Sequence, residues 1–180
     1  MSQFKKMIIF TSFIASFLLI TSTSSLGTQY DVGSGNDDWW TKYPDGHSGA
    51  GIEVNHPAWV LDALGSKPVL IYVHKVCDYC VPQTESVKNI TDEVSGKITF
   101  YEINADGGDV RSEEALQAYD PNGGITYVPL TVIVTLAPNS DGKVEPVWHS
   151  SDQITGDDWI KNYVEDALGQ YNENSGNWAN

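Results

Sequence analysis

Hydrophobic positions change their spacing several times along the chain, and each change marks a predicted element. Short continuous apolar runs, rich in β-branched and aromatic residues, predict strands. These runs are residues 68–73, 98–103, 129–136 and 144–149. Apolar residues spaced three and four apart predict helices instead. The helical segments are residues 57–64, 78–94, 112–119 and 157–168.

The order of these elements predicts how the sheet is built. Strands separated by helices pair in parallel through right-handed crossovers. The last two strands are joined by a tight turn at residues 139–142, so they pair antiparallel. Pro146 within the fourth strand favours a place at the sheet edge. The sequence therefore predicts an α/β fold with a mixed central sheet flanked by helices on both faces.

The segments outside this core have little periodicity. Residues 31–56 are rich in Gly, Asp, Asn and Ser, with aromatic residues at Trp39, Trp40 and Tyr43. We interpret residues 28–66 as an irregular extension with a short helix, and expect its Trp pair to pack on the main body. The main domain is then residues 67–170, followed by a frayed polar tail at 171–180.

The first residues have the layout of an export signal. Lys5 and Lys6 precede the mostly apolar residues 7–20, and residues 21–27 are small and mostly polar. This order is typical of a secretory signal peptide, here with cleavage after Gly27. An uncleaved membrane tether through residues 7–26 is the alternative, because the uncharged segment extends to Tyr30. Both interpretations predict an extracytoplasmic protein, secreted or tethered to the outer face of the cell membrane.

The charge of the chain excludes two classes of partner. The net charge is −14, and residues 28–180 hold all 24 acids against eight bases, a net −16. Nucleic-acid binding requires clustered Lys and Arg, and so does binding to anionic lipid headgroups. The 180 residues, 41% of them hydrophobic, suffice for one globular domain.

The two cysteines, Cys77 and Cys80, lie where the first buried strand ends and the next helix begins. The positive end of a helix lowers a thiol pKa, and the thiolate is the reactive form. We therefore expect Cys77 to be the exposed nucleophile and Cys80 to be the shielded, resolving cysteine. Two alternatives remain: a structural disulfide, or a copper or zinc carrier with His74 as a further ligand.

The cysteines and their surroundings resemble the thioredoxin superfamily. The resemblance is carried by four segments: Lys67–Val73, Cys77-Asp-Tyr-Cys80, Ile98–Asp106 and Val128-Pro129-Leu-Thr131. It implies a thioredoxin-like fold and a thiol–disulfide oxidoreductase that exchanges with protein thiols and disulfides. An upstream dithiol would supply electrons, and no dissociable cofactor is implied.

The resemblance also implies roles for residues near the cysteines. Pro129 is expected to be cis and to face them, and Val128 to offer its backbone to the partner as an added strand. Asp78 and Tyr79, between the cysteines, are expected to contact the partner as well.

The sequence departs from ordinary thioredoxins at several places. Val76 replaces the usual Trp, and Asp78-Tyr79 replaces Gly-Pro. Ile71 stands at the position of the buried Asp, and Glu102 at that of its partner Lys. We expect Glu102 to act as the proton acceptor for Cys80. A redox-inert interaction domain that uses Trp39 and Trp40 is a third alternative.

Overall fold

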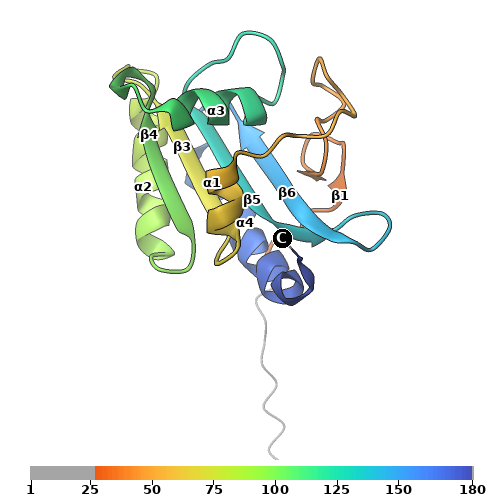
Figure 1. The fold of residues 1–180 in the computed structure, drawn as a ribbon. Coiled ribbons are helices and arrows are strands. Elements are labelled where there is room, and N and C mark those ends of the chain that lie inside the picture. The colour runs from red at the N-terminus through yellow and green to blue at the C-terminus, as the bar shows by residue number, and fades with distance from the viewer. Residues whose placement is uncertain (1–26, 180) are drawn as a thin grey trace, which may run out of the picture.

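A computed structural model describes residues 27–179 of the chain (Figure 1). Residues 1–26, which hold nearly all of the predicted signal peptide or tether, lie outside the described part. In residues 27–179 no helix has the length and apolar character needed to cross a bilayer.

One sheet of six strands forms the centre of the molecule, in the order β1-β2-β6-β5-β3-β4. β3 pairs in parallel with β4, and antiparallel pairs join β3 to β5 and β5 to β6. The strands are β1 (Val32–Gly33), β2 (Trp39–Trp40), β3 (Val69–His74), β4 (Thr99–Asn104), β5 (Leu130–Pro138) and β6 (Val144–Ser151).

Four α-helices and two short 3₁₀ helices complete the fold. They are α1 (Ala58–Leu64), α2 (Val81–Glu93), η1 (Ala105–Gly107), α3 (Val110–Tyr119), α4 (Gly156–Asn174) and η2 (Ser175–Asn177). From β3 to α4 the chain runs strand, helix, strand, helix, strand, strand, helix, with β3 and β5 central among these four strands. This arrangement is a thioredoxin-like fold, so the predicted fold class is confirmed.

The sheet separates two hydrophobic cores. α1 and α3 cover one face, where Ile71 of β3 contributes to the core. α2 and α4 cover the other face, where Tyr72 is buried. Successive strand residues point to opposite faces, so a strand covered on both sides is apolar throughout. This explains the continuous apolar run that predicted β3.

The N-terminal extension is part of this sheet. Trp40 pairs with Trp148 of β6, so β6 is not the sheet edge and the prediction drawn from Pro146 is wrong. Trp39 is buried in the core on the α4 side, and Trp40 in the core on the α1 side. The expected packing of the Trp pair on the main body is confirmed, and the two side chains reach opposite faces of the sheet.

The expected frayed tail is instead ordered structure. α4 continues to Asn174, beyond the predicted end at residue 168 and across the expected domain boundary at 170. The hydroxyl of Tyr171 donates to the carbonyl of Leu64 over 2.9 Å, and Trp178 packs against the core beside α1. The mostly polar sequence of this stretch did not predict these contacts, because they are made with α1, which is distant in sequence.

Candidate redox site

The two cysteines form a disulfide at the start of α2, with their Cα atoms 5.4 Å apart. Cys80 is the N-cap residue of the helix and is 2% exposed, whereas Cys77 is partly exposed in the preceding turn. The amide of Cys80 donates to the carbonyl of Cys77 over 3.0 Å, which closes that turn. α2 therefore begins three residues later than predicted, and its first residue, Val81, is exposed.

The carbonyl of Cys80 is held by groups from two elements. The Thr84 amide donates to it over 2.9 Å, and the hydroxyls of Tyr72 and Thr84 lie 3.1 and 2.9 Å from it. Burial raises the pKa of Tyr72 above its ordinary value, so the phenol remains protonated and able to donate. These contacts fix Cys80 relative to β3.

Gln83, in the first turn of α2, joins this helix to two further elements. Its amide nitrogen donates to the hydroxyls of Thr131 in β5 and Thr155 before α4, over 2.9 and 3.0 Å. Its amide oxygen accepts from the Thr155 backbone N–H over 2.8 Å. The side chain is completely buried, and all its bonds cross between elements. Neither Gln83 nor Tyr72 was predicted from the sequence as a site residue.

Pro129 immediately precedes β5, at the end of the strands where the disulfide lies (the disulfide edge). The Val128–Pro129 peptide bond is cis, as the resemblance implied. Leu130, the next residue, pairs with Val73, near the end of β3. Pro129 is buried and Val128 is partly buried, and their expected roles toward a partner stay predictions.

Glu102 lies on the edge strand β4, with its side chain 52% exposed. Its carboxylate contacts His74, with 3.3 Å between Oε1 and Nε2. His74 in turn stacks on Tyr72, whose hydroxyl lies near the Cys80 carbonyl. The structure thus connects Glu102 to the site through His74 and Tyr72, and its role as proton acceptor for Cys80 stays a prediction.

Asp78 and Tyr79 form the exposed turn between the cysteines. Lys75, two residues before Cys77, lies 3.5 Å from a carboxylate oxygen of Asp106. Because Asp78 and Tyr79 are exposed, both are accessible to a partner that approaches the disulfide.

The metal carrier and the redox-inert interaction domain each require features that can be compared with the structure. In residues 27–179, no group of three or more His, Cys, Asp or Glu side chains is arranged to hold a metal ion. His74, the further ligand considered from the sequence, contacts Glu102. Trp39 and Trp40 are buried, so they do not form the exposed interaction surface that the redox-inert alternative assigned to them.

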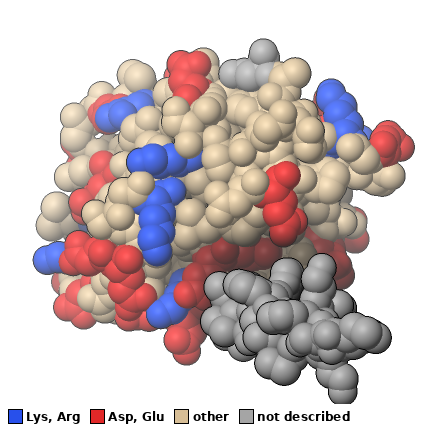
Figure 2. Space-filling model, turned by 90° about the horizontal axis from the view of Figure 1, so that it is seen from below, with Lys and Arg blue, Asp and Glu red and all other residues tan. Residues whose placement is uncertain are grey.

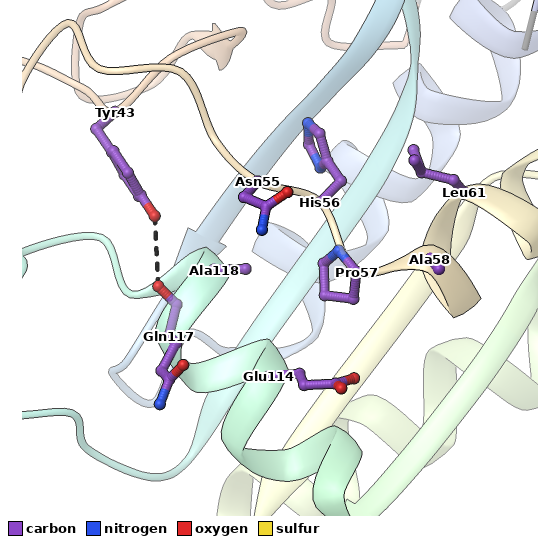
Figure 3. A pocket seen from close by; sticks show the side chains of 9 residues that line it. All are labelled: Tyr43, Asn55, His56, Pro57, Ala58, Leu61, Glu114, Gln117 and Ala118. Atoms are coloured by element: carbon purple, nitrogen blue, oxygen red, sulfur yellow. Dashed lines mark hydrogen bonds between the residues drawn. The ribbon is translucent and has the colours of Figure 1, made fainter.

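A separate hollow of about 600 Å³ lies between the extension, α1 and α3 (Figure 3). The Tyr43 hydroxyl donates across it to the Gln117 carbonyl over 3.3 Å. His56 at its wall contacts the Tyr119 hydroxyl, and burial lowers the pKa of His56 to about 4. The imidazole is therefore neutral at pH 7, and its contact with Tyr119 is structural.

Comparison with known proteins gives weak similarity only. No family model matches the chain, and no curated protein matches it. A solved structure described as a malarial protein is 10% identical, with 57% of this chain and 99% of that chain covered and a TM-score of 0.41.

Two other solved structures carry thioredoxin names. Thioredoxin-2, described as a component of the malaria parasite protein secretion machinery, is 8% identical over 55% of this chain and 82% of that chain (TM-score 0.39). Chloroplastic thioredoxin z is 16% identical over 64% of this chain and 88% of that chain (TM-score 0.41). The fold assignment therefore rests on the strand order, the helix placement and the position of the disulfide.

Proposed function

We propose that the protein is an extracytoplasmic thiol–disulfide oxidoreductase that acts on protein partners. The observation that carries this proposal is the disulfide at the start of α2, with Cys77 accessible and Cys80 buried. A disulfide that closes so short a loop restricts the unfolded chain little, which makes a purely structural role a poor explanation. The asymmetry of exposure suits an attacking and a resolving cysteine.

In the reductive direction, the Cys77 thiolate attacks one sulfur of the partner's disulfide. That bond breaks, a mixed disulfide forms, and the released partner sulfur takes up a proton. Cys80 then loses its proton and attacks the Cys77 sulfur, which releases the second partner thiol and restores the Cys77–Cys80 disulfide. Two electrons and two protons pass to the partner, and an upstream dithiol returns them. With a partner dithiol, the same steps run in reverse.

A disulfide-reduction assay tests this function. Dithiothreitol should reduce a protein disulfide at least about tenfold faster with the protein than without it, because a thiolate at a helix start is the better nucleophile. Cys77→Ser should abolish the acceleration, and Cys80→Ser should accumulate a mixed disulfide that mass spectrometry detects. Asp141→Asn, in the β5–β6 turn, is the matched control and should retain the rate. Equal rates for the wild type and Cys77→Ser would contradict the proposal.

The extracytoplasmic location rests on the sequence of residues 1–27. N-terminal sequencing of the protein from its own cells should give a chain that begins at Thr28 if the segment is cleaved. A tethered protein should keep residues 1–27 and sediment with membranes, with its cysteines accessible from outside the cell. An intact chain recovered in the cytoplasm would contradict both forms of the proposal.

A further inference from the structure

Exposed apolar side chains gather around the disulfide. Of the eight large hydrophobic residues that are exposed in residues 27–179, seven lie in the loops and helix starts at this edge of the sheet. Val76, next to Cys77, is 89% exposed. Those nearest in sequence to the cysteines, Pro129 and α4 are Val76, Tyr79, Val81, Ile125, Tyr127 and Ile154. Large apolar side chains grouped on a surface indicate a place where another molecule binds.

A hollow of about 590 Å³ adjoins this apolar surface. Lys75 from the turn before the cysteines lines one side, and Gly124 and Thr126 from the loop before Pro129 line another. The first turn of α3 completes it with Val110 and Glu113. The hollow gives a polypeptide room to continue beyond the disulfide.

The loops at the two edges of the sheet differ in charge. The loops at the disulfide edge (residues 75–80, 105–109, 120–129 and 152–155) contain five aspartates and one lysine. The loops at the opposite edge (residues 65–68, 94–98 and 139–143) contain three lysines and one aspartate. Figure 2 views the molecule from below Figure 1, the side of these loops, and shows several basic side chains in blue beside acidic ones in red.

Ion pairs with nearby aspartates neutralise the two basic side chains at the disulfide edge. Lys75 is paired with Asp106, and Arg111 with Asp109 over 2.6 Å. Asp78 and Asp152 have no cationic partner within residues 27–179. The surface around the disulfide is therefore apolar with unpaired negative charge, and a cationic partner is the one that complements it.

We propose that this surface binds polypeptides whose cysteines are flanked by lysine or arginine and by apolar residues. The inference rests on the proposed function, since it names the class of partner that reaches the disulfide. Apolar contacts supply affinity, and the aspartates select cationic segments and speed their approach. Asp78 contacts the segment beside its cysteines, and Asp152 contacts it at the β6–α4 side.

Two disulfide peptides test the proposal with the full chain. They share their apolar residues and differ only in lysine or glutamate next to each cysteine. At about 20 mM salt the lysine peptide should react at least about fivefold faster, and the preference should shrink toward unity near 500 mM, where screening shortens the range of surface charge. Asp78→Asn and Asp152→Asn should each reduce the preference by about half. Asp141→Asn, in the hairpin at the opposite edge, is the matched control and should leave it unchanged.

A binding measurement separates this inference from the proposed function. Calorimetry of the oxidised protein with versions of the peptides that carry serine for cysteine reports docking without exchange. Preferential binding of the lysine version supports the docking surface even if no peptide is reduced, which would overturn only the proposed function. Equal rates and equal binding for both peptides at low salt, or an unchanged preference in both Asp78→Asn and Asp152→Asn, would overturn this inference.

Discussion

His149 is a buried imidazole, 3% exposed, between aromatic rings. Its ring centroid lies 4.2 Å from those of Tyr163 and Trp40, and its Nδ1 is 2.8 Å from the Asp38 carbonyl. Burial lowers the pKa of His149 to about 4, although the Asp38 carbonyl and the charges of Asp37 and Asp38 oppose this shift. The pKa of His56 is lowered to about 4 as well. The folded protein thus keeps two neutral histidines that the unfolded chain protonates below about pH 6.5.

These two histidines predict a loss of stability in mild acid. Because the unfolded state binds more protons, the free energy of unfolding falls as the pH drops from about 6.5 toward 4, by about 2 kcal/mol per histidine at pH 5. His149→Gln should lose about half of the histidine contribution to the difference between pH 7 and pH 5, whatever its effect at pH 7. Urea unfolding at both pH values measures this. His56→Gln should lose the other half, and an unchanged pH difference in both variants would contradict the assignment.

The site residues divide according to how local their signal is. Cys77 and Cys80 were predicted because a strand end and a helix start follow from short stretches of sequence, and Pro129 because the residues around it carry the family resemblance. Glu102 was expected to serve Cys80, yet its described contact is with His74. Strand alternation sets the face to which such a side chain points, but the residue it contacts there is distant in sequence, and no local pattern identifies it.

At the scale of elements, α2 shows why the apolar pattern was misleading at one turn. Val81 is one of the apolar residues of the segment 78–94 yet is exposed, whereas the polar Gln83 is completely buried. A buried amide is tolerated when its polar atoms are satisfied, and here the partners are Thr131 and Thr155. Those partners lie 48 and 72 residues away, so the sequence around Gln83 could not reveal them.

Replacement of Gln83 tests how firmly these bonds join α2, β5 and the loop before α4. Gln83→Met keeps the approximate volume but leaves the buried Thr131 hydroxyl and the partly buried amide and hydroxyl of Thr155 without these partners. We expect the free energy of unfolding to fall by about 3 kcal/mol in urea titrations. Asn89→Ala is the matched control, since Asn89 links the same helix to Asp157 over 3.0 Å at the exposed surface. It should cost less than about 1 kcal/mol, and similar losses in both variants would contradict a special role for Gln83.

At the scale of the whole molecule, the sequence predicted the core of the fold but not how its margins close. β3, β4, β5 and β6 and the helices between them have clear periodicity, and all were found near their expected positions. β1 and β2 have two residues each, too few for any period to be visible. The continuation of α4 was missed because residues 169–174 are mostly polar, and Tyr171 among them reaches α1 through a hydrogen bond to the Leu64 carbonyl.

The extension should therefore unfold together with the sheet. Trp39 is completely buried on the α4 side, and its indole N–H donates to Asp166 over 2.8 Å. The same carboxylate oxygen accepts the backbone N–H of Tyr30, whose ring stacks on Tyr163 at 4.0 Å. These contacts attach the extension to α4 at several points, and Trp40 attaches it to the opposite core. One cooperative transition is expected for residues 27–179.

Trp39→Ala tests this coupling. Loss of a fully buried indole should lower the free energy of unfolding by about 4 kcal/mol and shift the whole transition, because the cavity opens in the core shared with α2 and α4. Ile52→Ala, an exposed apolar residue of the same extension, should change it by less than about 0.5 kcal/mol. Within each variant, the midpoint seen by tryptophan fluorescence should equal the midpoint seen by far-UV circular dichroism. An earlier, separate transition seen by fluorescence alone would mean that the extension only rests on the sheet, and that the two cores are stable without it.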